Sequence, residues 1–360
     1  MKNYQVLANL ETLEKVVSYI EQIKSGTSPG RYLFDRIKHL DLAKITTIEF
    51  IELLVRTKRP QIFAEVEIYG NGIDWSQKEL SILGDISIVT PVTVYDNGKH
   101  RNPDLHHIPF AATLIFTPGS LLRNGNRITP VDWVEVTIDD KIDYEGYYRL
   151  YERRFLPAFI HANELAKQQG KMALITIPGM GCGQFAGIFR GQLGAELRRM
   201  LTQFLGTHGS NFSNIKVVYF DPYQECENER IEIEDISLFV RPLTKGNINK
   251  PQLCHPQDYS EAGDNFDDCA LFSFVAWDHV SWPGNDFYLG ARSTDDGVKA
   301  AATDVMRVMT GIEGSYNSYL YRYSQPAQYE TWKDVVFKNK IQLEVVDNLI
   351  ILPSDRIAPV

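Results

Sequence analysis

The sequence has few cysteines, and they do not form the pairs that hold structural zinc. Cys182, Cys226, Cys254 and Cys269 are widely separated, and no two of them stand in a Cys-x-x-Cys arrangement. Structural zinc sites usually need such closely spaced ligands. We therefore expect no zinc site, and we expect the thiols to stay reduced, as in a cytosol-like compartment.

Long hydrophobic runs are also missing. No stretch approaches the roughly 18 consecutive apolar residues of a membrane-spanning helix. The polar residues after Met1 lack the apolar core of a secretory signal. We expect a cytoplasmic protein with neither a membrane span nor a Sec signal, although an export signal of another kind would escape this test.

Basic residues are in deficit, since 37 Lys and Arg face 46 Asp and Glu, for a net charge of −9. A field of this sign repels nucleic acid and anionic membrane surfaces, so we expect neither as a partner. The net charge does not exclude a small ligand that carries phosphate, because backbone amides can bind phosphate without Lys or Arg.

Several familiar catalytic patterns are absent. There is no Gly-x-Ser-x-Gly elbow, no Gly-Lys-Ser/Thr phosphate loop and no helix-spaced histidine pair. The pairs His106-His107 and Cys254-His255 are adjacent in sequence, so their side chains would diverge in a strand. Cys182 has no histidine partner that the sequence identifies. We expect neither a serine hydrolase nor a P-loop enzyme, and no bound metal or cofactor.

The composition that remains is typical of a soluble globular protein, with 360 residues of which 44% are hydrophobic and 23% charged. Residues 11–59 favour helices, interrupted by a Gly- and Pro-containing stretch at 25–30. Two apolar stripes support them, at Leu13, Val16, Val17 and Ile20 and at Ile48, Ile51, Leu53 and Leu54. We predict a helical N-terminal subdomain or cap over residues 1–59.

From residue 60 onwards, short β-rich runs alternate with helical patterns. Strands are predicted at 61–69, 86–95, 110–116, 172–177, 215–220 and 269–276, helices at 144–169, 189–204 and 298–309, a long polar connection at 242–268 and a closing hairpin at 341–352 with its turn at Asp347-Asn348. Pro157 should kink or interrupt the first of these helices. The alternation predicts an α/β domain over residues 60–360, with a mixed, largely parallel sheet covered by helices on both faces.

The first candidate site is rich in glycine. It is the run Pro178-Gly-Met-Gly-Cys-Gly-Gln-Phe-Ala-Gly187, between a predicted strand and a predicted helix. Glycines permit positive φ angles and close backbone approach, so amides and the helix N-terminus can surround a diphosphate. The spacing fits neither a Walker loop nor a dinucleotide-binding fingerprint. The alternative is a simple turn.

The second candidate site follows the predicted strand at 269–276, at the end of a strand where open α/β sheets bind ligands. It contains four carboxylates, Asp278, Asp286, Asp295 and Asp296, and four aromatic residues, Trp277, Trp282, Phe287 and Tyr288. Such a mixture suits a planar base, a sugar face or a guanidinium.

Plainer interpretations of this segment stay open. Residues 294–296 could be a helix cap with acids in the first turn. Asn285-Asp286 could be a turn after Pro283-Gly284. The aspartates could also bind Mg²⁺, because hard cations prefer oxygen ligands.

Together, the two segments resemble a macrodomain, the α/β/α fold that binds ADP-ribose. Residues 178–187 are similar to its diphosphate-binding loop. Residues 284–297, Gly-Asn-Asp-Phe-Tyr-Leu-Gly-Ala-Arg-Ser-Thr-Asp-Asp-Gly, are similar to the arginine-specific macrodomain ADP-ribosylhydrolases found among bacterial effectors. The loops typical of other mono-ADP-ribosyl hydrolases and of poly(ADP-ribose) glycohydrolases are not visible, so ester-linked and polymeric substrates are not expected.

The resemblance implies a macrodomain-like three-layer α/β/α sandwich with an N-terminal helical extension. It implies that Asp278, Asp286 and Asp296 are the catalytic carboxylates of the arginine-linkage site, and it leaves Asp295 as a helix cap. The ADP-ribose contacts that it implies are Gly179, Met180, Gly181, Cys182, Gly183, Gln184, Phe185, Trp277, Trp282, Asn285, Phe287 and Asp295.

Chemistry makes this assignment sensible. Aspartates can hold the cationic guanidinium of ADP-ribosylated arginine by charge-assisted hydrogen bonds. Cleavage of the N-glycosidic bond develops oxocarbenium character, which a carboxylate stabilises or exploits by activating water. Within the resemblance we expect Asp286 or Asp296 to be the acid/base and Asp278 the guanidinium anchor.

The resemblance also implies an effector that acts in the host cytoplasm, with ADP-ribosylated ubiquitin as its target. Two other functions stay open. One is a module that binds ADP-ribose without cleaving it, and the other is a metal-dependent phosphodiesterase that uses the same aspartates.

Overall fold

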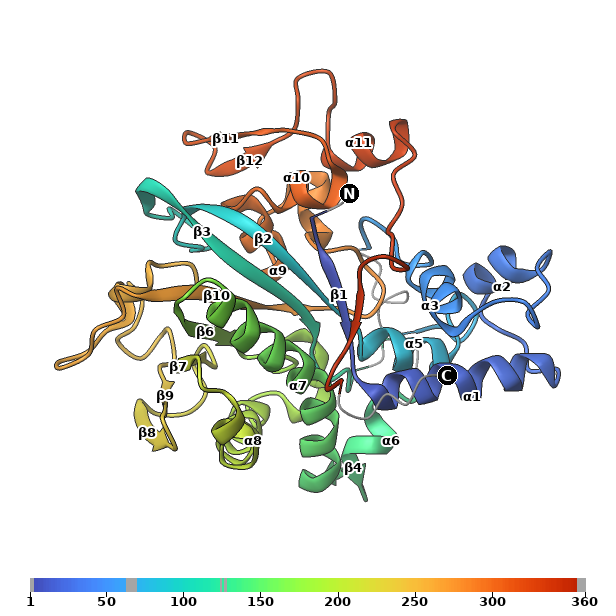
Figure 1. Ribbon diagram of the computed structural model, residues 1–360, viewed down its shortest axis with the longest axis horizontal. Helices are drawn as coiled ribbons and strands as arrows, with labels where there is room; N and C mark the ends of the chain where they lie inside the picture. The colour runs from blue at the N-terminus through green and yellow to red at the C-terminus, as the bar shows by residue number, and fades with distance from the viewer. Residues whose placement is uncertain (1–2, 63–69, 124, 126–127, 355–360) are drawn as a thin grey trace.

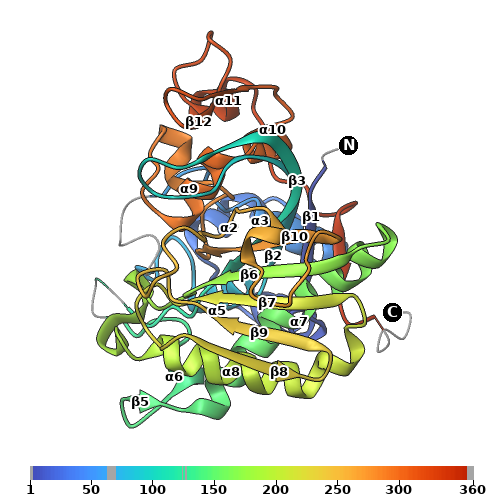
Figure 2. The same cartoon turned by 90° about the vertical axis from the view of Figure 1, so that its left-hand side faces the viewer.

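The structure is a computed structural model that describes residues 3–62, 70–123, 125 and 128–354. A nine-stranded mixed sheet crosses the molecule in the order β13-β1-β2-β3-β10-β6-β7-β9-β8 (Figures 1 and 2). Parallel pairs join β3, β10, β6, β7 and β9. The strands are β1 (Gln5–Ala8), β2 (Ser87–Asp96), β3 (Leu105–Pro118), β6 (Met172–Pro178), β7 (Ile215–Asp221), β8 (Glu229–Ile233), β9 (Ile236–Val240), β10 (Cys269–Trp277) and β13 (Leu349–Ile351).

Helices cover both faces of the sheet, as the sequence predicted. The side chains of successive strand residues point to opposite faces of the sheet. Val6 and Phe116 therefore belong to one hydrophobic cluster, and Leu7 and Ile115 belong to the other. One face carries α7 (Tyr144–Gln168) and α8 (Leu193–His208). The other carries α1 (Leu10–Lys24), α2 (Arg31–Ile37), α3 (Thr47–Val55), α5 (Gln77–Gly84), α9 (Asp295–Ala302), α10 (Val305–Thr310) and α11 (Trp332–Lys338). The result is a three-layer α/β/α sandwich.

Smaller elements lie at the periphery of these layers. They are α6 (Trp133–Val136), the short hairpins β4 (Thr137–Ile138) with β5 (Lys141–Ile142) and β11 (Ser315–Asn317) with β12 (Arg322–Ser324), and the 3-10 turns η1 (Gln184–Phe189), η2 (Gly209–Asn211), η3 (Pro256–Tyr259) and η4 (Asn285–Leu289).

Most predicted central elements are confirmed. β2, β3, β6, β7 and β10 lie where β-rich runs were predicted. The long helix α7 runs through Pro157 without the predicted interruption. Phe155 and Phe159, on either side of this proline, pack on Phe274 of β10 with ring centroids 5.0 and 5.7 Å apart. We attribute the continuity to this packing, which outweighs the hydrogen bond that proline cannot make.

The edges of the sheet were predicted less well. β1 was not predicted, although Val6 pairs with Ile88 of β2 and with Leu349 of β13. The hairpin predicted at 341–352 is wrong, because Leu343 and Val345 pack into the core and only β13 is a strand, parallel to β1. β8 and β9 were not predicted either. Most of the strand predicted at 61–69 falls on residues 63–69, outside the described residues.

Two helical predictions need correction. The helix predicted to start near residue 189 begins at Leu193, because η1 occupies residues 184–189. The helix predicted at 298–309 is divided into α9 and α10 at Thr303-Asp304. There the chain bridges to β2 at Val94, and Asp304 Oδ1 accepts a hydrogen bond of 2.6 Å from Thr93 N.

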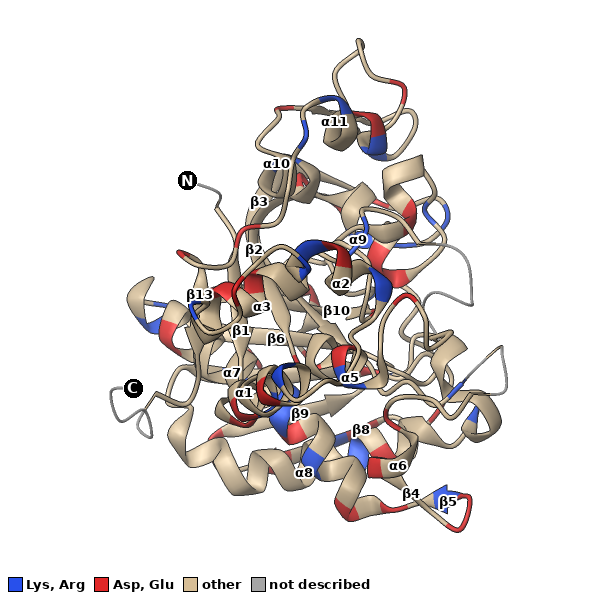
Figure 3. Ribbon diagram, turned by 90° about the vertical axis from the view of Figure 1, so that its right-hand side faces the viewer, with Lys and Arg blue, Asp and Glu red and all other residues tan. Residues whose placement is uncertain are grey.

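The N-terminal residues are packed against the rest of the molecule. They supply β1 to the sheet and α1, α2 and α3 to one helical layer, in the same hydrophobic cluster as α9 and α10. Lys and Arg stand beside Asp and Glu along α1 and α2 (Figure 3), as in the pairs Lys24–Glu21 and Lys38–Asp35. The boundary at residue 59 stays a prediction. Within the described ranges, no helix is long and apolar enough to cross a membrane.

Candidate functional site

The two candidate segments leave the sheet from neighbouring strands. β10 lies between β3 and β6 and runs parallel to both, so the carboxyl ends of these strands share one edge (Figure 2). The glycine-rich loop, residues 178–187, follows β6, and the acidic loop, residues 278–297, follows β10. The rings of Phe185 and His279 lie 6.4 Å apart, centroid to centroid. The structure therefore brings the two motifs together.

Glycine is required where the glycine-rich loop touches the segment after β3. Gly181 has a φ of +75°, and a Cβ there would lie 2.7 Å from Ser120 Oγ. A Cβ on Gly119 would collide with the backbone of Gly181. Gly187 has a φ of +56°, and its Cβ would lie 2.8 Å from Leu122 O. These segments approach too closely to accept side chains.

Buried side chains of α7 hold this loop from inside the molecule. Tyr151 Oη donates a hydrogen bond of 2.7 Å to Met180 O and accepts one of 3.1 Å from Ser120 N. Arg154 Nη1 donates to the carbonyl of Gly119 at 3.0 Å. The backbone of the loop is thereby fixed before any ligand arrives.

Arg154 belongs to a buried ion network that the sequence did not reveal. Its guanidinium lies 2.8 Å from Asp132 and 3.2 Å from Asp85. Arg153 and Lys15 also reach Asp85, at 2.7 and 2.6 Å. Burial raises the pKa of the Asp132 carboxyl, but the Arg154 charge, His279 and the amide of Leu121 together outweigh burial and hold this pKa well below its usual range. Removing one partner from such a network leaves an uncompensated buried charge.

The outer side of the glycine-rich loop is open. Among the described residues, the amides of Gly181 and Gly183 have no hydrogen-bond acceptor; the amide of Gly181 is packed against Gly119, whereas Gly183 is exposed. A Cβ on Gly183 would meet no atom within 4 Å. Phosphate oxygens accept hydrogen bonds from backbone amides and from arginine side chains. A groove of about 550 Å³ lies here, lined by Leu122, Arg123, Gly183, Gln184, Gly187, Ile188 and Arg190.

The other residues of this loop that were predicted to contact ADP-ribose differ in burial and in hydrogen bonding. Met180 is fully buried, and Cys182 is nearly so. Burial also raises the pKa of the Cys182 thiol well above its usual value. Gly179 has room for a Cβ, whose nearest neighbours would lie 3.4 Å away. The Gln184 side chain accepts a hydrogen bond of 2.8 Å from Arg123 Nη1. Met180 and Cys182 could thus serve a ligand mainly through their backbone.

Asp278 is engaged in holding the start of the acidic loop. Its Oδ1 accepts hydrogen bonds from Val280 N at 2.7 Å and Ser281 N at 2.6 Å. Its Oδ2 accepts from Ser281 Oγ at 2.5 Å and from Asn285 Nδ2 at 3.2 Å. Asn285 Oδ1 in turn accepts from Ile62 N at 2.8 Å. Both oxygens of Asp278 are therefore occupied by this loop.

Asp286 holds the other end of the acidic loop. Its Oδ2 accepts from Ser293 N at 2.9 Å and Thr294 N at 3.1 Å, and its Oδ1 accepts from Thr294 Oγ1 at 2.6 Å. A Cβ on Gly297 would collide with this carboxylate. Burial raises the pKa of Asp286, while these hydrogen bonds act against the rise.

Asp296 differs from its neighbours because half of its carboxyl group is unused. Oδ1 accepts a hydrogen bond of 2.6 Å from Gly284 N. Oδ2 is buried and has no hydrogen-bond partner among the described residues. Burial raises the pKa of Asp296 well above its usual value, and the charges of Asp286, Asp278 and Asp295 add to the rise. A buried carboxyl oxygen without a partner is costly in the free protein, and a carboxyl group whose pKa is perturbed in this way is a candidate functional group.

Asp295 was expected to cap a helix, and this expectation is wrong by one residue. Thr294 is the N-cap of α9, because its backbone is extended and its side chain accepts from Gly297 N at 3.0 Å. Asp295 lies in the first turn, where its Oδ2 accepts from Ala276 N and from the buried Lys299 Nζ. In the described part of the chain, no three Asp, Glu, His or Cys side chains are grouped as metal ligands.

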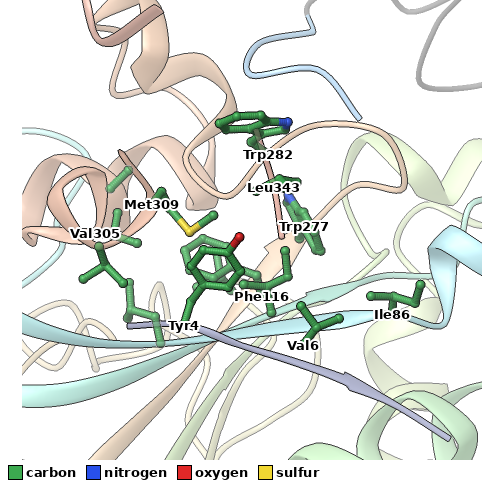
Figure 4. Close-up of a cluster of buried hydrophobic side chains, with 14 of the residues drawn as sticks. Tyr4, Val6, Ile86, Phe116, Trp277, Trp282, Val305, Met309 and Leu343 are labelled. Atoms are coloured by element: carbon green, nitrogen blue, oxygen red, sulfur yellow. The ribbon is translucent and has the colours of Figure 1, made fainter. Parts of the chain in front are cut away.

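The predicted aromatic contacts are part of the core. Trp277, Trp282 and Phe287 are 2%, 4% and 1% exposed. Figure 4 shows the two tryptophans in one hydrophobic cluster with Tyr4 and Met309. Trp277 Nε1 has no hydrogen-bond partner among the described residues. These rings form the wall behind the acidic loop, and they present no open face to a base or sugar.

Lys58 was missed by the sequence analysis, although it lies at the heart of this region. Its Nζ donates a hydrogen bond of 2.6 Å to His279 O and lies 3.9 Å from the centre of a Trp277 ring. The side chain is buried, and burial lowers its pKa to about 7, while Asp278 and Asp296 act in the opposite direction. The basic run at residues 56–59 looks in sequence like an exposed helix end, so nothing marks Lys58 as buried.

Comparison with known proteins agrees with this geometry. No curated protein matches the chain in a sequence search. The family model described as "Macrodomain effector MavL" matches residues 4–329, which is most of the chain. A macrodomain implies a function related to ADP-ribose, and the three-layer fold with its glycine-rich loop at the strand ends is consistent with one. The protein therefore belongs to the MavL family of macrodomain effectors.

Proposed function

We propose that this protein is a hydrolase that removes ADP-ribose from arginine side chains of a modified protein. The observation that carries the proposal is the buried Oδ2 of Asp296, which has no hydrogen-bond partner among the described residues and lies in a loop with three further aspartates. This loop and the glycine-rich loop follow adjacent parallel strands. The amides of the glycine-rich loop suit a diphosphate, and the carboxyl oxygen suits a cationic guanidinium.

In the proposed reaction, the bond between the ribose anomeric carbon and the guanidine nitrogen breaks. Asp296 is the best candidate for the acid/base, because its raised pKa lets it carry a proton for the leaving guanidine. It then accepts a proton from the water whose oxygen adds to the anomeric carbon. Asp278 and Asp286, whose oxygens hold backbone amides, keep the loop around Asp296 in place. This differs from the expectation that Asp278 anchors the guanidinium.

The resemblance makes ADP-ribosylated ubiquitin the proposed substrate, and the effector family makes the host cytoplasm the proposed place of action. The test incubates the protein with arginine-ADP-ribosylated ubiquitin and follows its intact mass, with and without EDTA. We expect loss of the whole ADP-ribose group, with EDTA having no effect. A cut within the diphosphate that EDTA prevents would instead identify a metal-dependent phosphodiesterase.

Asp296→Asn sharpens this test. We expect kcat/KM to fall by about 100-fold or more, because the acid/base is lost, while the affinity for free ADP-ribose changes little. Asp267→Asn is the matched control, since Asp267 is an exposed aspartate outside the acidic loop, and it should behave as wild type. Equal losses of turnover, ADP-ribose binding and thermal stability in Asp296→Asn would contradict the assignment.

A module that binds ADP-ribose without cleaving it is the second candidate. The amides proposed to bind the diphosphate belong to the glycine-rich loop, so this binding does not require the aspartates. An unchanged ubiquitin mass together with micromolar binding of free ADP-ribose would favour it.

A further inference from the structure

The groove beside the glycine-rich loop differs from the protein as a whole in its charge. The chain carries a net charge of −9, yet the described residues that line this groove of about 550 Å³ include two arginines and no acid. A groove of this size can hold a small ligand. Two cations in its wall, with no acid between them, favour a ligand with negative charge.

Arg123 reaches the groove from the segment that follows β3. Its Nη1 donates a hydrogen bond of 2.8 Å to Gln184 Oε1, which ties the guanidinium to the glycine-rich loop. The segment itself is fixed to the same loop, because Leu122 N donates a hydrogen bond of 2.9 Å to Phe185 O. The Arg123 side chain is half-buried. Its guanidinium is therefore oriented before a ligand arrives, which lowers the entropy that binding costs.

Arg190 reaches the groove from the far end of the loop, directly after η1. Its side chain is exposed, and none of the ion pairs formed by the described residues includes it. Gly183 lines the groove as well, and its exposed amide has no acceptor in the described structure. Guanidinium groups and amides are the donors that bind phosphate oxygens, and a guanidinium can donate two parallel hydrogen bonds to one phosphate.

We infer that Arg123 and Arg190 are specificity-determining residues: their guanidinium groups bind the diphosphate of ADP-ribose in this groove, together with the exposed amide of Gly183. The inference rests on the proposed function. It adds two side-chain cations to a phosphate site for which the sequence analysis required only backbone amides. A diphosphate carries its charges on two neighbouring phosphates, so it can engage two guanidinium groups at once.

Charge-removing substitutions test the two arginines. We expect Arg123→Gln and Arg190→Gln each to lower the affinity for free ADP-ribose about tenfold, because a charge-assisted contact is lost. The weakening of binding by salt, measured calorimetrically between about 0.05 and 0.5 M NaCl, should become shallower in both variants. Arg190→Lys should restore this salt dependence and only part of the affinity, because a lysine keeps the charge without the paired donors.

Arg149→Gln is the matched control, since Arg149 is an exposed arginine of α7 that does not line the groove. It should bind ADP-ribose as the wild type does. Thermal stability should be unchanged in Arg190→Gln, which separates loss of a ligand contact from loss of structure. Wild-type affinity and wild-type salt dependence in both groove variants would overturn the inference.

Gln184→Ala tests whether the hydrogen bond from Arg123 orients the guanidinium. We expect a loss of affinity smaller than that in Arg123→Gln, and no further loss when Gln184→Ala is added to Arg123→Gln. The same loss in both backgrounds would contradict the positioning role of Gln184, because the glutamine would then act independently of Arg123.

A measurement on the unaltered protein identifies the anion that the groove holds. Pyrophosphate is titrated calorimetrically into the protein, with and without saturating ADP-ribose. Binding that ADP-ribose abolishes supports the inference. Absence of binding, or binding that ADP-ribose leaves unchanged, overturns it, because the groove would then not hold the diphosphate of ADP-ribose. Removal of ADP-ribose from ubiquitin at the wild-type KM in both arginine variants would keep the proposed function and exclude the two arginines from it. Absence of both turnover and ADP-ribose binding in the wild type would reject the two together.

Discussion

The glycine-rich loop is held by side chains that come from other elements, whereas the acidic loop is held by carboxylates of its own. Tyr151 and Arg154, both on α7, fix the first loop and the segment it touches. Asp278 and Asp286 bind amides at residues 280–294 and so fix the second. The two loops lie at the ends of adjacent parallel strands. The first depends on side chains of a helix, whereas the second depends largely on its own carboxylates, with further hydrogen bonds from residues 58–62.

This difference shows why the four aspartates are not equivalent. A loop that folds around its own carboxylates occupies their oxygens, and an occupied oxygen is a poor acceptor for a ligand. Asp278 and Asp286 serve the loop, while Asp296 keeps one oxygen without a partner in the described structure. In the glycine-rich loop, the groups without a partner among the described residues are backbone amides, because side chains of α7 hold the loop.

The comparison predicts that the glycine-rich loop can be weakened from a distance, and Arg154→Met should do so most strongly. It removes the donor to Gly119 O and leaves Asp132 without its ion-pair partner. We expect the free energy of unfolding to fall by about 3–5 kcal/mol, measured by urea denaturation. Arg198→Met is the control, because its pair with Glu229 is partly exposed and should contribute at most about 1 kcal/mol. Similar losses in both variants would show that the buried network is not special.

Tyr151→Phe should have a smaller effect on the same loop. It removes the hydroxyl that bridges Met180 O and Ser120 N, leaving two buried polar groups without this partner. We expect a loss of about 1–3 kcal/mol and weaker binding of ADP-ribose, with the acidic loop unaffected. Tyr219→Phe is the control, since the buried Tyr219 hydroxyl has no hydrogen-bond partner in the described structure. If ADP-ribose affinity were unchanged in Tyr151→Phe, the loop would not need this support.

Gly183→Ala should change stability least, by about 1 kcal/mol or less, because a Cβ would meet no atom within 4 Å. It should nevertheless lower the affinity for ADP-ribose about tenfold, since a methyl group would keep a diphosphate from the open amides. Calorimetry with free ADP-ribose measures this effect. Wild-type affinity would place the diphosphate elsewhere.

The centre of the fold was predictable because its strands are buried on both faces. β6 and β7 are mostly apolar, which fits a parallel sheet covered by helices. β1 and β13 could not be predicted in the same way, because four and three residues give almost no pattern. Their strand state depends on the partner beside them. β8 alternates half-buried and exposed residues at the opposite edge and resembles a polar connection.

The positions of the two loops were predictable from the sequence, but the roles of the individual residues in them were not. The order of strand, loop and helix placed the glycine-rich and acidic loops at one sheet edge. Which carboxylate oxygen stays unpartnered depends on hydrogen bonds such as Gly284 N to Asp296 Oδ1, and these follow no spacing rule. Lys58 contacts His279 across 221 residues of sequence, so local patterns carry no sign of it. The tryptophans looked like ligand contacts because sequence alone does not separate a site wall from the core.

The pairing of β1 with β13 has a consequence for how the chain acquires its structure. Tyr4 and Glu344, next to these strands, are hydrogen-bonded across 340 residues of sequence. As the chain is synthesised, the region of β13 is made about 340 residues after that of β1, so one side of β1 lacks its neighbour during that interval. An unpaired strand edge is a template for association with other chains, and contacts of such long range form slowly. The nascent protein therefore carries an aggregation-prone edge until β13 pairs with β1.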